Sequence, residues 1–182
     1  TLPNHITDLY NIKSYIGPVL KEYPSGLLAE QGYISKCNVK AIEIDYSSIE
    51  SRTYKDIKTE VFNKKARLNI IKNIVNNTND NILLLVSYIA EGDKLTKLIN
   101  RYAKKEVVFL SGKDKTNIRE EWRKRMINEK NIALIATYGI FQQGINIPNL
   151  KYCILASPTK SKIRTLQSVG RTLRTHENKK DG

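Results

Sequence analysis

Gln167, Arg171 and Arg174 form the pattern in this sequence that is best suited to chemistry. They belong to the segment Gln167-Ser168-Val169-Gly170-Arg171-Thr172-Leu173-Arg174. At about 100° per residue of an α-helix, the three side chains fall within a stripe about 60° wide. Guanidinium groups are planar, permanently charged and geometrically matched to phosphate oxygens. The spacing therefore predicts a helix that presents one amide and two guanidinium groups to an anionic ligand such as a phosphate chain.

The same helix has an apolar side that we expect to be buried. It gathers about 110° away from the polar stripe and consists of Ile163, Leu166, Val169 and Leu173. Gly170 lies mid-helix, where glycine costs about 1 kcal/mol relative to alanine, so we expect another backbone or a ligand to approach closely there. A solvated basic face is the alternative interpretation, because long charged side chains normally lie at the surface.

Small and hydroxyl-bearing residues follow each of four apolar segments. They are Ser87-Tyr88, Ser111-Gly112-Lys113, Thr137-Tyr138-Gly139 and Ser157-Pro158-Thr159. Hydroxyl and backbone N–H groups hold much of a nucleic-acid backbone. Each segment taken alone is compatible with an ordinary turn or helix cap. Together they predict a ligand-binding edge, since ligands of open α/β sheets bind beyond the carboxyl ends of the strands.

The elements that must position these residues alternate between strand and helix. Short apolar runs predict strands at 82–87, 107–110, 132–137 and 152–156. Helical spacing predicts helices at 94–103, 117–128 and 161–174. Apolar strands separated by amphipathic helices are typical of a parallel sheet that is covered on both faces. The sequence thus predicts an α/β fold, doubly wound.

The chain before residue 82 is less regular. Turn signals within residues 1–36 indicate a connecting or accessory segment. Period-two alternation predicts a strand at 39–46, and apolar residues at helical spacing predict one long helix between Ile57 and Val75. The polar segment 76–80 separates this helix from the first strand of the alternating region.

Composition limits the classes of protein to consider. The chain has 182 residues, with 31 Lys and Arg against 18 Asp and Glu, a net charge of +13 and a pI near 9.7, which indicates a nucleic-acid partner. The longest apolar runs have five residues, against about 18 for a membrane span. Two Cys and two His cannot form a structural zinc site of the usual spacing, so no metal site is predicted. These features favour a reduced, intracellular protein.

A phosphate loop of Walker type, G-x-x-x-x-G-K-[ST], is absent from the sequence. No acidic pair follows an apolar strand in the place where a magnesium-holding carboxylate is needed. We therefore expect this chain alone not to hydrolyse ATP.

Three segments resemble motifs of superfamily 2 helicases. Gln167–Arg174 is similar to motif VI (Q-x-x-G-R-x-x-R), Ile135–Pro148 to motif V and Leu84–Ser87 to motif IV. Their order and spacing agree over residues 81–174, and the run from Tyr138 to Arg174 resembles phage UvsW-type DNA helicases.

This resemblance implies a second, C-terminal RecA-like domain, an α/β parallel sheet flanked by helices whose last strands can lie outside this chain. Residues 37–182 would form that domain. Residues 1–36 would be a linker or accessory segment that follows a first RecA-like domain outside the chain. ATP and Mg²⁺ would be bound mainly by this first domain.

The resemblance also implies roles for individual residues. Arg171 and Arg174 would reach the ATP phosphates as arginine fingers, and Gln167 would sense the nucleotide. Gly144 and Asn146 would lie near the nucleotide, with Asn146 standing where many relatives have Asp. Four residues would hold the nucleic-acid backbone: Ser87, Ser111, Gly112 and Thr137.

The implied function is the C-terminal motor half of an ATP-dependent DNA helicase or translocase that unwinds or remodels DNA, as in recombination and repair. Its partner would be single-stranded, forked or branched DNA, in the cytoplasm of a bacterial host if a virus encodes the protein. Two alternatives remain open: a stand-alone basic nucleic-acid-binding module without turnover, and part of an RNA helicase. The residues do not indicate an oligomeric state.

Overall fold

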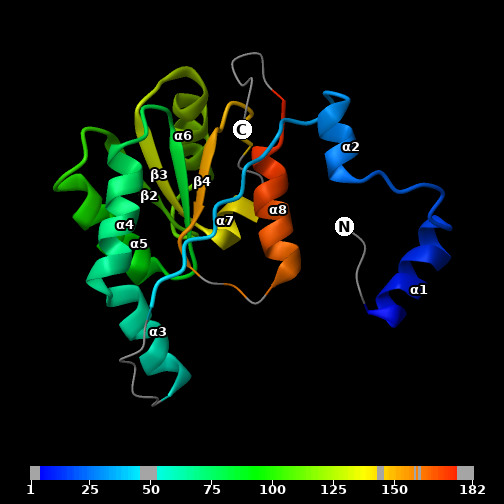
Figure 1. Cartoon of the computed structure of the whole chain (residues 1–182), viewed down its shortest axis with the longest axis horizontal. Coiled ribbons are helices and arrows are strands. Elements are labelled where there is room, and N and C mark those ends of the chain that lie inside the picture. Colours follow the sequence, from blue (N-terminus) through cyan, green and yellow to red (C-terminus); the bar gives the residue numbers. More distant parts are fainter. Residues whose placement is uncertain (1–4, 46–52, 143–145, 158, 160, 176–182) are drawn as a thin grey trace.

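A computed structural model describes residues 5–45, 53–142, 146–157, 159 and 161–175 (Figure 1). A four-stranded parallel sheet lies at its centre, with the strand order β2-β3-β1-β4. The strands are β1 (Ile82–Val86), β2 (Glu106–Leu110), β3 (Ile132–Thr137) and β4 (Tyr152–Leu155). The predicted α/β fold with a parallel sheet is confirmed.

Helices cover both faces of this sheet. They are α1 (Ile6–Ile16), α2 (Ser25–Glu30), α3 (Tyr54–Asn63), α4 (Lys65–Asn76), α5 (Ile89–Asn100), α6 (Thr116–Asn128), α7 (Tyr138–Gln142) and α8 (Lys162–Thr172). Helices α4 and α5 pack on one face, and α6 and α7 pack on the other. Helix α8 contacts α7 and β4, whereas α1 lies away from the sheet and buries no residue (Figure 1).

The central strand β1 supplies side chains to both cores. Leu83 and Leu85 face the core beneath α6 and α7, whereas Ile82, Leu84 and Val86 face the core beneath α4 and α5. All five side chains are fully buried. Burial on both faces explains why the strand reads as a continuous apolar run without alternation.

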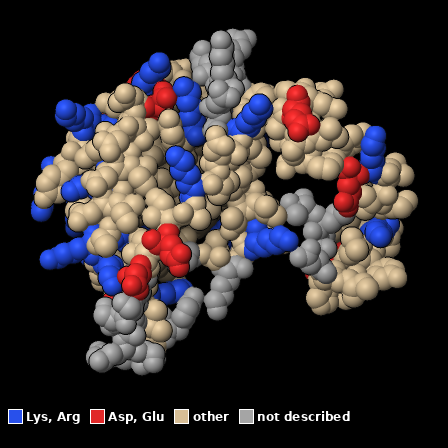
Figure 2. Space-filling view, in the orientation of Figure 1, with Lys and Arg blue, Asp and Glu red and all other residues tan. Residues whose placement is uncertain are grey.

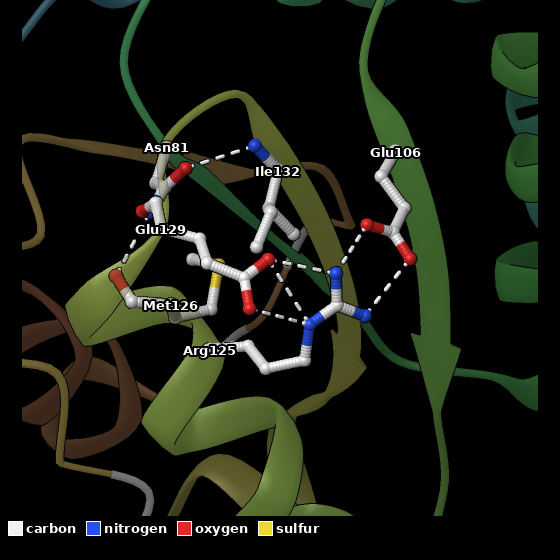
Figure 3. Close-up of polar contacts among 6 residues, drawn as sticks. All are labelled: Asn81, Glu106, Arg125, Met126, Glu129 and Ile132. Carbon is white, nitrogen blue, oxygen red and sulfur yellow. Dashed lines mark hydrogen bonds and ion pairs between the residues drawn. The ribbon is translucent and has the colours of Figure 1, made fainter.

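A polar cluster ties α6 to the amino ends of the strands (Figure 3). The Asn81 side chain accepts a hydrogen bond from the Ile132 N–H at 2.8 Å and donates to the Met126 carbonyl at 2.8 Å. The Arg125 guanidinium donates to the carboxylates of Glu129 and Glu106, and these hydrogen bonds raise the pKa of Arg125. This edge of the sheet is therefore occupied by structural contacts.

The prediction of a strand at 39–46 is wrong for its described part. Residues 37–45 form neither strand nor helix, and Val39 and Ile42 are exposed. Tyr46 lies outside the described residues. A period-two pattern becomes a strand only where a neighbouring strand satisfies its backbone N–H and C=O groups, and no described strand pairs with this segment.

Helix boundaries also differ from the prediction. The single long helix is two helices, because Lys64 adopts an extended ψ of 122° between α3 and α4. A capping box of Thr53 and Asp56 starts α3. Helix α5 begins at Ile89 instead of 94, and α8 ends at Thr172 instead of 174. The sequence pattern did not predict α1, α2 or α7.

One glycine sets how closely α5 packs on the sheet. A Cβ atom placed on Gly92 would lie 2.2 Å from Cε2 of Phe109 on β2. The aromatic ring thus fills the space that a side chain would need. At Gly170 of α8, by contrast, a Cβ atom would meet nothing within 4 Å among the described residues, so the close approach expected there is not found within this part of the chain.

We expect Gly92→Ala to lower the free energy of unfolding by about 1–3 kcal/mol, because overpacking displaces Phe109 or α5. Urea denaturation followed by circular dichroism measures the change. Gly170→Ala is the matched control and should be neutral or stabilising by up to about 1 kcal/mol, since alanine favours a helix interior. Equal stability of the two variants would contradict the close packing of Gly92 on Phe109.

Candidate nucleic-acid and nucleotide interface

The parallel register brings the predicted rim residues to one edge of the sheet. Leu110 pairs with Ala136 and Val86 pairs with Thr137. Thr137 therefore ends β3 at the edge of the sheet where Ser111 and Ser87 follow β2 and β1. Ser157 completes the row, because its N–H donates to the Leu85 carbonyl at 3.3 Å. The spatial grouping that the sequence predicts is therefore present, while the ligand contacts assigned to these residues stay predictions.

The hydroxyl of Ser111 shapes a turn instead of facing solvent. Ser111 is buried, its hydroxyl lies 3.1 Å from the Asp114 carboxylate, and its N–H donates to the same carboxylate at 2.6 Å. The hydroxyl also accepts the Lys113 N–H at 3.3 Å. Gly112, at the tip of this turn, is exposed. The arrangement offers the Gly112 backbone to a ligand and keeps Ser111 as its support.

A buried chain of polar side chains reaches the end of β1 from α4 and α5. The Arg67 guanidinium of α4 forms an ion pair with Glu91 of α5 and donates to the Ala156 carbonyl at 2.7 Å. Glu91 also accepts a hydrogen bond from the Ser157 hydroxyl. That hydroxyl in turn accepts the Ser87 N–H at 2.8 Å. The position of Ser87 thus depends on Arg67 through Glu91 and Ser157.

Tyr138 at the start of α7 joins the same chain. Its hydroxyl donates to the Ser157 carbonyl at 2.9 Å, and burial of the ring raises the pKa of Tyr138 to about 12. The hydroxyl therefore remains a donor at neutral pH. The Arg164 guanidinium of α8 lies 5.6 Å from the centroid of the Tyr138 ring. Tyr138 thereby links the ends of β3 and β4 to α8.

Arg67 and Glu91 were not predicted as site residues, although the sequence contains a signal for them. Arg67 precedes Ile71 and Val75 at spacing i, i+4 and i+8, and Glu91 precedes Leu95 and Ile99 at the same spacing. Each charged residue therefore heads an apolar helical stripe that faces the core. Two opposite charges on two such stripes indicate a buried ion pair.

Helix α8 packs by a different face from the one predicted. Ser168 and Thr172 are buried, whereas Ile163 and Leu166 are 47% and 41% exposed, so the predicted burial of Ile163 and Leu166 is wrong. The buried hydroxyls are satisfied within the helix, because Ser168 donates to the Arg164 carbonyl at 2.9 Å. Small side chains without unsatisfied polar groups let α8 approach α7 closely.

The two motif arginines lie near each other at the end of α8. Arg171 is half-buried, and its guanidinium lies 5.2 Å from the ring centroid of Phe141 on α7. Burial, and to a lesser extent the nearby Arg174 charge, lower the pKa of Arg171. Arg174 and Gln167 are exposed, and Arg174 lies two residues beyond the end of the helix.

A residue from the amino-terminal part of the chain anchors this arginine segment. Ser35 is buried, although its neighbours in the connecting segment are largely exposed. Its N–H donates to the Leu173 carbonyl at 2.8 Å, and its hydroxyl donates to the Arg174 carbonyl at 3.2 Å. The carbonyls at the end of α8 are thus satisfied from outside the helix, which restrains the backbone at Arg174.

The other two predicted nucleotide-binding residues are Gly144 and Asn146. Gly144 lies outside the described residues. Asn146 lies against α6, where its carbonyl accepts a hydrogen bond from Arg123 at 3.3 Å. Its side-chain Oδ1 is buried without a hydrogen-bond partner in the described part of the chain, so this oxygen keeps unused accepting capacity.

The described residues contain no group of three or more His, Cys, Asp or Glu side chains suited to a metal ion. Within the same ranges, no helix is long and apolar enough to cross a membrane. Cys37 and Cys153 are free thiols, and burial raises the pKa of Cys153 to about 12. Lys and Arg side chains are spread over the face shown in Figure 2 and are not gathered into one patch.

The parallel sheet, its row of strand-end turns and the arginine-bearing α8 define the second RecA-like domain of a superfamily 2 helicase. The model of the Helicase conserved C-terminal domain family matches residues 66–176, more than half of the chain. The chain belongs to this family.

Known relatives agree with this assignment. The chain is 30% identical over 181 residues to the ATP-dependent DNA helicase uvsW of Enterobacteria phage T4, covering 93% of this chain and 36% of the relative. The crystal structure of T4 UvsW has a TM-score of 0.60 at 29% identity, covering 73% of this chain and 27% of that one. The E. coli DEAD-box protein SrmB, with a TM-score of 0.53 at 20% identity over 64% of this chain and 66% of its own, shares the fold.

We expect Glu91→Leu to lower the free energy of unfolding by about 3–5 kcal/mol, because it leaves the Arg67 charge buried without its partner. The double variant Arg67→Met/Glu91→Leu should recover most of this loss, since no unpaired charge remains. Urea denaturation measures both. Glu120→Ala, which removes the exposed ion pair with Arg123, should cost at most about 1 kcal/mol. A similarly small cost for Glu91→Leu would refute the role of this buried pair.

Proposed function

We propose that this chain is the C-terminal motor domain of an ATP-dependent DNA helicase or translocase that acts on single-stranded, forked or branched DNA. The observation that carries the proposal is the position of Arg171, which is half-buried against Phe141 of α7 with the Arg174 charge nearby at the end of α8. The chain spans about a third of the T4 relative's length. The activity therefore belongs to a larger assembly in which a first RecA-like domain faces α8.

The electrostatics of α8 support a role for the arginines at a phosphate chain. Two nearby guanidinium groups repel each other, and the half-burial of Arg171 strengthens this repulsion by limiting solvent screening. A polyphosphate placed against both would offset the repulsion. The packing of Arg171 on Phe141 restricts its motion, so the positive charge is positioned before phosphoryl transfer begins. Gln167, which is exposed on the same helix, would sense the nucleotide.

ATP and Mg²⁺ would be bound mainly by the first RecA-like domain. This chain lacks a Walker phosphate loop, and its described part lacks an acidic cluster for the metal. Its own contribution is charge stabilisation by Arg171 and Arg174 on the transferred phosphoryl group. We therefore propose that the chain alone does not hydrolyse ATP. Residues 37–182 would form the motor domain, and residues 1–36 would link it to the first domain.

The nucleic-acid backbone would lie along the rim formed by the Gly112 turn, Thr137 and Ser87. Hydroxyl and backbone groups there can position phosphates without reading bases. The T4 relative is named a DNA helicase, which favours DNA over RNA for this chain, in the cytoplasm of a bacterial host if a virus encodes it. The competing function is a nucleic-acid-binding module without turnover, and the following experiments separate the two.

In the complete two-domain protein, we expect Arg171→Ala to lower the DNA-stimulated turnover of ATP by a factor of about 10³ to 10⁵, with a much smaller effect on ATP binding. Because Arg171→Ala also uncovers Phe141, Arg171→Lys is measured beside it. Lysine keeps the charge but lacks the planar pair of donors, so turnover should still fall strongly. Steady-state kcat and nucleotide affinity are the measurements.

Arg174→Ala should behave like Arg171→Ala. Lys162→Ala removes a positive charge from the exposed first turn of α8 and should leave turnover within about twofold of the parent. Near-normal kcat for both arginine variants would remove α8 from the ATP site. Hydrolysis of ATP by the 182-residue chain alone would contradict the half-motor proposal itself.

We expect the chain to bind single-stranded DNA with little sequence preference and with an affinity that falls as salt rises from about 50 to 200 mM, because bound phosphates release counterions. Fluorescence anisotropy with oligonucleotides of two unrelated sequences measures this. Binding restricted to one sequence, or unchanged by salt, would refute backbone recognition at the rim. Normal binding by a complete protein that never hydrolyses ATP would favour the module without turnover.

A further inference from the structure

A hollow of about 320 Å³ lies between α3 and α5, immediately beyond the end of β1. Its floor is formed by the buried side chains of Leu68, Glu91 and Leu95. Its walls include Phe62 of α3 and Tyr88, the residue that follows Ser87. The volume is at the lower end of the range of about 300–1,000 Å³ found for small-ligand sites.

Two aromatic rings line this hollow, and two lysine side chains lie beside it or in its lining. The rings of Phe62 and Tyr88 are tilted by 58° with centroids 5.7 Å apart, and Tyr88 is 46% exposed. The Lys58 ammonium donates to the Tyr88 hydroxyl at 2.7 Å, and the Lys94 ammonium donates to Asn63. Lys94 and Asn63 are themselves part of the lining.

We infer that this hollow binds one unstacked base of a single-stranded nucleic acid, with the base against the Tyr88 ring and the adjoining phosphates near Lys58 and Lys94. The inference rests on the proposed function, in which the strand passes Ser87. Neighbouring Cα atoms are about 3.8 Å apart, so a strand held at Ser87 passes within reach of the Tyr88 side chain. An apolar, aromatic wall beside positive charge is the combination that single-strand binding proteins use for sequence-tolerant stacking.

If Tyr88 stacks on a base, the affinity for single-stranded DNA should depend on its aromatic ring and not on its hydroxyl. Tyr88→Ala should weaken binding of an oligo-dT strand by about 5-fold to 100-fold, because loss of one base–aromatic stack has effects of that size. Tyr88→Phe keeps the ring and loses only the hydrogen bond with Lys58, so it should bind within about threefold of the parent. Tyr88→Leu keeps an apolar side chain without a π face and should resemble Tyr88→Ala.

Tyr102 provides the matched control. It is 53% exposed and has the Lys72 ammonium 4.8 Å from its ring centroid, but it precedes β2 and so lies at the opposite edge of the sheet. Tyr102→Ala should leave oligo-dT binding unchanged. Thermal unfolding of all variants identifies any loss of folding, and Tyr88→Phe remains informative if Tyr88→Ala is unstable.

The deciding comparison uses an abasic strand of the same length as the oligo-dT. If Tyr88 stacks on a base, the parent should bind the abasic strand less tightly than oligo-dT, and Tyr88→Ala should bind both alike. Equal binding of both strands by the parent, with no effect of Tyr88→Ala, would overturn this inference and leave the rim intact. Absence of binding to either strand would contradict the proposed function instead. Tyr88-dependent binding of ATP, without an effect on oligo-dT, would assign the hollow to a free nucleotide and overturn the inference.

Discussion

The parallel pairing of β1 with both β3 and β4 is the constraint on which the rest of the molecule depends. All five side chains of β1, from Ile82 to Val86, are fully buried on the two faces of the sheet. Burial of each side chain contributes about 1.5–3 kcal/mol to the free energy of unfolding. A shift of one residue would exchange the side chains that face the two cores, so the close-packed contacts on both faces would be lost. Because all strands run in the same direction, every turn that follows a strand emerges at one edge. The rim is therefore a consequence of core packing, and the amino-end edge is left for the structural contacts around Asn81.

The buried pair of Arg67 and Glu91 is better understood as a positioning device than as a source of stability. Removing two charges from water costs several kcal/mol, which their attraction offsets only when the remaining donors and acceptors are satisfied. Here the remaining groups bond to the Ala156 carbonyl and the Ser157 hydroxyl. The ion pair thereby fixes Ser157, and Ser157 fixes the N–H of Ser87. The buried ion pair thus sets the geometry at the end of β1, where the proposed nucleic-acid contact at Ser87 lies next to the hollow lined by Tyr88.

Elements that depend on local sequence patterns were predictable from the sequence, whereas features that depend on residues far apart in the chain were not. The strands and α6 follow from apolar runs and helical spacing, which are local. The segment 39–46 has the pattern of a strand, but no described strand pairs with it. Ile163 and Leu166 have the apolarity of a core face, yet Ser168 packs inward because its hydroxyl bonds within the helix. The anchoring of Arg174 by Ser35 joins residues 139 positions apart, and no spacing rule indicates it.

One side of helix α8 packs on the rest of the domain, and the other side exposes apolar residues. Phe141 supports Arg171, and Ser35 holds the backbone of Leu173 and Arg174, so the two guanidinium groups are kept near each other despite their repulsion. The opposite side exposes Ile163 and Leu166, and a Cβ atom at Gly170 would meet nothing within 4 Å among the described residues. A bound polyphosphate would offset the repulsion between these two positive charges. The sequence has no Walker phosphate loop that could bind one. In the proposed motor, the free energy released when the first domain delivers ATP to α8 is thus coupled directly to closure of the two domains.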